Sequence, residues 1–178
     1  RRVLFRSKNL KAYALYFKKF VKEYEKEDII INQVHIQNEP IADQKFPSCV
    51  WSGKKIRDFI KDYIGPLFEE SNMDTEIWLG TLNSPYDDYG DDNWQFGQYN
   101  NFANMILSDK NARKYVSGVG YQWGGKHALL QTKIAYPEIK IIQTENECGE
   151  GKNSWEYAEY VFNLMWTYLM NGACAYVY

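Results

Sequence analysis

Histidine, cysteine and long apolar runs are all scarce in this 178-residue sequence. Its two histidines, His35 and His127, are too few for a metal site built from imidazole ligands. The three cysteines, Cys49, Cys148 and Cys174, show no CxxC spacing, and we expect them to be buried as small apolar side chains. No apolar run is long enough to cross a bilayer. The sequence therefore gives no reason to expect a metal site built from His or Cys ligands, or stable insertion into a membrane.

Basic charge is not in excess either. The 21 Lys and Arg residues are balanced by 23 Asp and Glu, so the chain lacks the electrostatic footprint of a nucleic-acid-binding protein. Aromatic residues, in contrast, are abundant at 17% of the chain, with 15 Tyr and 6 Trp. Such rings either fill a core or stack on the apolar faces of sugar rings. Composition alone does not separate these two uses.

Apolar periodicity predicts helices and strands in regular alternation. Helices are expected at residues 9–26, 52–70, 99–115, 126–136 and 153–171. Strands are expected from the apolar run at 29–31 up to residue 39, and at 76–83, 116–123, 139–144 and 173–178. Alternation of this kind, without a linker, predicts a single α/β domain with a parallel sheet.

Local signals refine two of the helices. Gly65 and Pro66 fall inside the second helix, and they predict a kink or break because proline cannot donate a hydrogen bond to the preceding turn. Asn153 and Glu156 have the spacing of a capping box at the start of the last helix, and Gly172 fits its end.

Two of the expected strands end in a carboxylate. The first closes on Asn38-Glu39-Pro40, where Pro40 must end the strand because it cannot donate to a sheet ladder. The fourth closes on Glu145. In a parallel (β/α)₈ barrel the active site lies at the carboxyl ends of the strands. Three strand–helix units of roughly 31 residues need roughly 95 residues, which fits the separation of Glu39 and Glu145 along the sequence. Two carboxylates that face each other across one cleft are the catalytic groups of a glycoside hydrolase.

Residues beside the two glutamates leave alternatives open. Glu147 lies two positions beyond Glu145 on the same strand face, and the two-carboxylate chemistry alone would accept either residue. Asn38 either caps a turn or contacts a sugar hydroxyl. His35 shares the strand face of Glu39 and is interpreted as a core histidine.

Three residues end the third strand and are therefore predicted to face the cleft: Tyr121, Gln122 and Trp123. Trp123 either forms a wall of a sugar subsite or packs in the core. The loop at 84–98 also has several interpretations: a solvated acidic loop, sugar subsites built by Tyr86 and Trp94, or a Ca²⁺ site, although its Asp spacing matches no Ca²⁺ motif.

Three short motifs together resemble glycoside hydrolase family 30, the family of glucosylceramidase-like β-glycosidases and related β-1,6-glucanases and xylanases. They are Gln37-Asn38-Glu39-Pro40, Pro47-Ser48-Cys49 and Thr144-Glu145-Asn146-Glu147-Cys148-Gly149. The resemblance covers residues 8–178. It implies a retaining β-glycoside hydrolase that needs no cofactor, with Glu39 as acid/base on strand four and Glu145 as nucleophile on strand seven. It also implies that Asn38 binds the sugar 2-hydroxyl.

The third strand departs from that family pattern. Glucosylceramidase-like members carry a His-Trp-Tyr-like segment whose tyrosine lies near the nucleophile, whereas this chain has Tyr121-Gln122-Trp123. Trp123 has no hydroxyl to offer Glu145. The departure argues against a lysosomal-type specificity for ceramide glycosides.

On this resemblance, residues 8–178 form part of a TIM-barrel catalytic domain, from about helix three to the start of strand eight. Residues 1–7 resemble a translated sequencing adapter and are expected to be non-native. An incomplete barrel exposes a sheet edge, so the isolated chain is expected to be unstable or to aggregate, and to be inactive. The family implies a secreted enzyme acting on a carbohydrate or glycolipid. The alternatives are a non-catalytic carbohydrate-binding protein and another clan member, such as a family 5-type endoglucanase.

Overall fold

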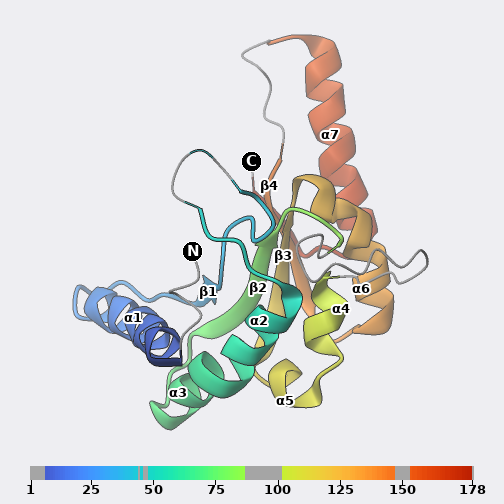
Figure 1. Cartoon of the computed structure of the whole chain (residues 1–178). Helices are drawn as coiled ribbons and strands as arrows, with labels where there is room; N and C mark the ends of the chain where they lie inside the picture. Colours follow the sequence, from blue (N-terminus) through green and yellow to red (C-terminus); the bar gives the residue numbers. More distant parts are fainter. Residues whose placement is uncertain (1–6, 44, 46–47, 87–101, 147–152, 178) are drawn as a thin grey trace.

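A five-stranded parallel sheet forms the centre of the chain (Figure 1). The computed structural model describes residues 7–43, 45, 48–86, 102–146 and 153–177. The strands lie in the order β1-β2-β3-β4-β5, and every neighbouring pair is parallel. Their bounds are β1 Gln33–His35, β2 Glu76–Leu82, β3 Val116–Gln122, β4 Lys140–Glu145 and β5 Ala175–Tyr176. The predicted α/β class with a parallel sheet is confirmed, and the sheet is open rather than closed into a barrel.

Helices connect successive strands. Their bounds are α1 Ser7–Glu25, α2 Gly53–Phe59, α3 Gly65–Glu70, α4 Phe102–Leu107, α5 Lys110–Arg113, α6 Leu129–Ala135 and α7 Trp155–Met170. In Figure 1, α1 to α3 lie toward the β1 and β2 end of the sheet, and α4 to α7 lie toward the other end. The core forms where helices pack on strands, as the complete burial of Phe59, Leu79, Ile106 and Ile141 shows.

The predicted strand at 29–31 is wrong. Ile29 and Ile30 are 48% and 68% exposed, and the chain enters the sheet only at Gln33, which pairs with Glu76. The apolar run therefore precedes the strand. The cysteines also differ from expectation: Cys49 is half-buried and Cys174 is exposed, while Cys148 lies outside the described residues.

Proline shapes the second helix as its sequence predicts. A π-helical turn, η1, spans Ile60–Ile64 directly before Gly65 and Pro66, and the Gly65 N–H donates to the Ile60 carbonyl five residues back. A wider turn of this kind accommodates the lost hydrogen bond. Gly65 itself has no room for a side chain, because an added Cβ would lie 2.3 Å from Cδ2 of Tyr115.

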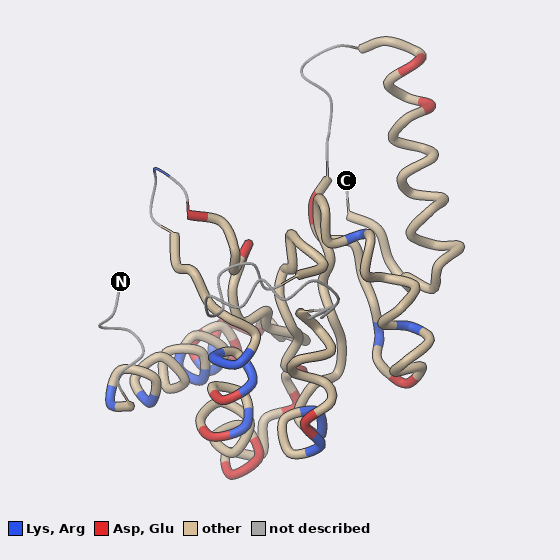
Figure 2. Tube along the Cα trace, turned by 45° about the vertical axis from the view of Figure 1, so that its right-hand side comes forward, with Lys and Arg blue, Asp and Glu red and all other residues tan. Residues whose placement is uncertain are grey.

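The last helix begins one residue later than predicted. Ser154, rather than Asn153, is its N-cap, and the Ser154 hydroxyl accepts from the Tyr157 N–H at 3.2 Å. Leu164 and Tyr168 are the buried residues of α7, whereas Trp155 is 76% exposed. In Figure 2, Lys and Arg gather on α1, α2 and α5, while α7 carries only acidic charge. Within the described ranges no helix is both long and apolar enough to span a membrane.

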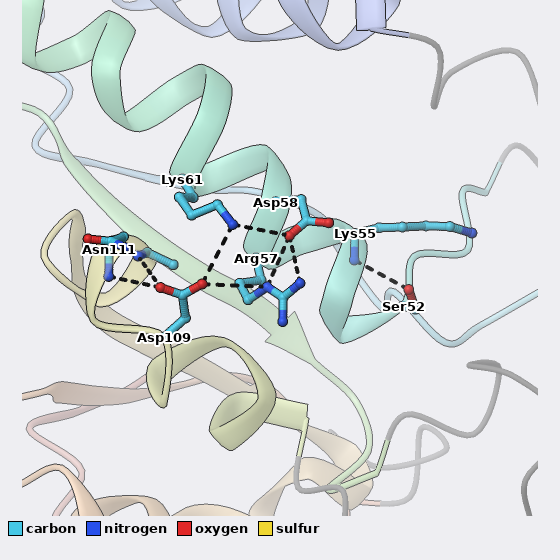
Figure 3. A network of polar contacts seen from close by, with 8 residues as sticks. Ser52, Lys55, Arg57, Asp58, Lys61, Asp109 and Asn111 are labelled. Atoms are coloured by element: carbon cyan, nitrogen blue, oxygen red, sulfur yellow. Dashed lines mark hydrogen bonds and ion pairs between the residues drawn. The ribbon is translucent and has the colours of Figure 1, made fainter.

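The predicted helix at 99–115 is divided in two by Asp109 (Figure 3). The Asp109 carboxylate accepts from the Asn111 N–H at 2.9 Å and so caps α5. Its second oxygen lies 3.8 Å from Arg57 Nε and 3.6 Å from Lys61 Nζ. Arg57 belongs to α2 and Lys61 to η1, which follows α2 directly. The Asp109 carboxylate therefore ties the start of α5 to a helical segment that is distant from it in sequence.

We expect Asp109→Asn to flatten the acid dependence of stability. The Asn111 N–H, followed by the other donors and cations around it, lowers the pKa of the Asp109 carboxyl. A lowered folded pKa gives stability that is present above the unfolded value, about 3.9, and is lost as pH falls through the folded pKa. Asparagine still caps the helix but does not titrate. Urea unfolding of the complete protein between pH 6 and pH 3 should show a smaller loss of stability for D109N than for wild type; equal losses would contradict the prediction.

Candidate active site

The two predicted carboxylates meet at one edge of the sheet. Glu145 is the last residue of β4, and Glu39 lies four residues beyond the end of β1. Because all strands are parallel, both residues lie at their carboxyl ends. Glu39 is half-buried and Glu145 is exposed. Glu147, the alternative to Glu145, lies outside the described residues.

Gln122 links the two carboxylates through one nitrogen. It is the last residue of β3 and is completely buried. Its Nε2 atom donates to Glu39 Oε1 at 3.1 Å and lies 3.5 Å from Glu145 Oε2. Both carboxylates are therefore within hydrogen-bonding reach of a single amide. The two carboxylates are thereby held close together at one edge of the sheet.

Trp123 also contacts Glu145, but through its ring nitrogen. The indole Nε1 donates to Glu145 Oε1 at 3.2 Å, and the side chain is 36% exposed. As predicted, Trp123 offers Glu145 no hydroxyl; its ring N–H makes the contact instead. The two oxygens of Glu145 therefore have different donors, Trp123 on one and Gln122 on the other.

The backbone turns sharply at both ends of this site. Glu39 has φ of 46° and Trp123 has φ of 48°, a left-handed conformation that is uncommon for residues other than glycine. Such backbone is retained mainly at functional sites, where the surrounding structure holds it. At Glu39 the surrounding bonds are present, because its N–H donates to the Thr81 carbonyl at 3.0 Å and the Pro40 carbonyl accepts from Trp51 at 2.8 Å.

Tyr121 is buried against α6 and has no exposed surface, so the prediction that it contacts substrate is wrong. Its side chain is 0% exposed, and its hydroxyl lies 2.6 Å from Oγ1 of Thr132 on α6. Burial raises the pKa of this phenol. The reason is strand alternation: with Gln122 facing the carboxylates, its neighbour must face the helices.

Two threonines that were not predicted as site residues contact the amides of the site. Thr81 Oγ1 donates to Asn38 Oδ1 at 2.5 Å, and Thr144 Oγ1 donates to Gln122 Oε1 at 3.2 Å. Each hydroxyl thereby binds the oxygen end of an amide, and in Gln122 this leaves the NH₂ end to contact the two carboxylates. The available signal was their position beside strand ends, but nothing in their residue type distinguished them from other strand threonines.

His35 lies on β1, in the strand that leads to Glu39, and its ring is half-buried beside Trp78. Burial lowers the pKa of His35. Its Nε2 lies 3.2 Å from Gln33 Nε2, and an added Cβ on Gly120 would lie 2.8 Å from its Cε1, so glycine makes room for the ring. These surroundings agree with its interpretation as a core histidine.

His127 and the acidic loop, the other features considered in the sequence, make no described contact with the two carboxylates. His127 is exposed, and Tyr86 is 43% exposed at the start of the acidic loop. The rest of that loop, including Trp94 and the acidic cluster considered for Ca²⁺, lies outside the described residues. Over the described part of the chain, no group of three or more His, Cys, Asp or Glu residues is placed to hold a metal ion.

Comparison with known proteins gives one matching family model, the "Glycosyl hydrolase family 30 TIM-barrel domain", over residues 6–165. "Putative glucosylceramidase 2" of Caenorhabditis elegans is 32% identical over 159 residues, which are 84% of this chain and 29% of the relative. "Endo-1,6-beta-D-glucanase BGN16.3" of Trichoderma harzianum is 29% identical over 79 residues, 44% of this chain and 16% of that protein. The chain spans less than a third of the length of either relative.

Solved structures agree with this match. The endo-beta1,6-glucanase BT3312 superposes with a TM-score of 0.80 at 25% identity, over 95% of this chain and 37% of its own. SrfJ from Salmonella typhimurium superposes with a TM-score of 0.74 at 19% identity, over 96% of this chain and 37% of its own, which supports the fold alone.

Proposed function

The chain belongs to glycosyl hydrolase family 30, and we propose that Glu39 and Glu145 form the catalytic pair of a retaining β-glycoside hydrolase. The observation that carries the proposal is the bridge from Gln122 Nε2 to both carboxylates, at 3.1 and 3.5 Å. A carbohydrate-binding protein without activity would not need two carboxylates on one donor.

In the first step, Glu39 gives its proton to the glycosidic oxygen while a Glu145 oxygen bonds to the anomeric carbon and the leaving group departs. In the second step, Glu39 takes a proton from water, and that water displaces Glu145 from the sugar. Gln122 and Trp123 both donate to Glu145, which keeps the carboxylate oriented for attack. Asn38 lies next to the acid and contacts the sugar hydroxyl on C2.

A β-glucoside is the substrate class that we propose. The relatives are named as glucosylceramidases and endo-1,6-β-D-glucanases, and a β-linked glucose is the unit these activities share. The described sheet is open, so the activity is proposed for a protein in which this chain is joined to the rest of its barrel. Inactivity of residues 1–178 alone, and a secreted location, stay predictions.

The test is covalent labelling of that complete protein with dinitrophenyl 2-deoxy-2-fluoro-β-glucoside. The fluorine slows both steps, and the activated leaving group keeps the first step fast enough for the glucosyl-enzyme to accumulate. We expect one label per active site, and mass spectrometry of the peptides should place it on Glu145. A label on Glu147 would keep the enzyme class and correct the nucleophile. A folded protein that neither hydrolyses aryl β-glucosides nor takes the label would overturn the proposed function.

A further inference from the structure

One hydroxyl group fixes the orientation of Asn38. Thr81 Oγ1 donates to Asn38 Oδ1 at 2.5 Å, a short hydrogen bond between β2 and the segment that follows β1. Asn38 is exposed and Thr81 is half-buried. Because Thr81 engages the oxygen end of the amide, the NH₂ end is directed away from Thr81.

A bulge in β2 brings Thr81 to this position. Gly80 has φ of 92°, and the pairing of β2 with β3 shifts register between Leu79 and Leu82. Bulges of this kind occur beside active sites, where they redirect a side chain. Gly80 cannot be replaced without distortion, because an added Cβ would lie 2.4 Å from the Leu82 nitrogen.

Backbone hydrogen bonds hold the two segments together on either side of the bulge. The Gln37 N–H donates to the Gly80 carbonyl at 3.2 Å, and the Glu39 N–H donates to the Thr81 carbonyl at 3.0 Å. The residues on both sides of Asn38 are therefore tied to Gly80 and Thr81. These backbone hydrogen bonds therefore hold Thr81 and Asn38 next to each other, independently of their side-chain contact.

We propose that Thr81 is a positioning residue that aims the Asn38 NH₂ group at the C2 hydroxyl of the bound sugar. The inference rests on the proposed function, since Asn38 meets a sugar only if the cleft binds one. A lone amide can rotate and present either its oxygen or its nitrogen, and holding one rotamer lowers the ordering cost of binding. Thr81 therefore makes hydrolysis sensitive to the presence of the C2 hydroxyl without touching the substrate.

The test compares two substrates in the complete protein: an aryl β-glucoside and its 2-deoxy counterpart. Thr81→Val keeps the shape of the side chain and removes the hydroxyl. We expect kcat/KM on the glucoside to fall about tenfold, as for loss of one oriented hydrogen bond, and kcat/KM on the 2-deoxy substrate to fall less than about twofold. Thr81→Ser, which retains the hydroxyl, should restore the wild-type ratio between the substrates.

Thr144→Val is the matched control, because Thr144 holds Gln122 rather than Asn38. It should reduce the rates on both substrates to a similar extent. If T81V does not fold, Thr81→Ala removes the same hydroxyl with less strain and gives the same comparison. Equal losses on both substrates, or no loss in the Val and Ala variants, would overturn the inference and leave the proposed function intact. A wild-type protein inactive on both substrates would overturn the proposed function first, and the inference with it.

Discussion

Glu145→Ala is expected to lower kcat for an aryl β-glucoside by about 10⁴-fold or more in the complete protein. The reason is that no group is left to bond to the anomeric carbon, and the covalent intermediate cannot form. Glu147→Ala is the matched control: it removes a carboxylate two residues away and should leave the rate within about threefold of wild type if Glu145 is the nucleophile.

Sodium azide makes this result specific to mechanism. In the E145A protein the small anion can enter the space left by the side chain and attack from the same face as Glu145. One displacement should then give the α-glucosyl azide, with recovery of rate as azide concentration rises. If E145A gains no rate with azide and E147A loses as much activity as E145A, both variants are misfolded. If azide restores the rate of E147A alone, Glu147 is the nucleophile.

The alternating elements could be predicted because helical periodicity and apolar strands follow directly from burial on one face. The errors have local causes. Ile29 and Ile30 resemble a buried strand in composition, yet they precede the first ladder bond and remain exposed. The predicted helix at 99–115 overlooked Asp109, although an aspartate within a helical pattern is also a strong N-cap.

The placement of Glu39 and Glu145 at one edge of the sheet could be predicted because each follows an apolar strand of a parallel sheet, whose carboxyl ends meet at the same edge. Their companions were harder to predict. Strand alternation assigns Tyr121 and Trp123 to the same face, but the left-handed φ at Trp123 turns its indole back to Glu145 while Tyr121 stays in the core. Thr81 depends on the bulge at Gly80, and no simple pattern in the sequence announces a bulge.

Glu39→Ala should slow the two chemical steps to different extents, and the effect on the first step should depend on the leaving group. A methyl or other alkyl β-glucoside needs protonation to depart, so its kcat/KM should fall by about 10² to 10⁴-fold. A dinitrophenyl β-glucoside expels dinitrophenolate, which needs no proton to depart, so its first step should be nearly unchanged. Its second step still needs a base to activate water, and the glucosyl-enzyme should therefore accumulate, with kcat and KM falling together.

Azide distinguishes Glu39 from Glu145 by the stereochemistry of the product. In E39A the intermediate on Glu145 still forms, and azide needs no base to attack it, so a second displacement should give the β-glucosyl azide and raise kcat on the dinitrophenyl substrate. Glu39→Gln keeps an oxygen acceptor for Gln122 while removing the proton, so it should lose activity like E39A despite an intact hydrogen bond. Asp43→Asn, at an exposed carboxylate four residues on, should behave as wild type. An α-azide product from E39A would instead mean that Glu39 is the nucleophile, and that the roles of the two carboxylates joined by Gln122 are reversed.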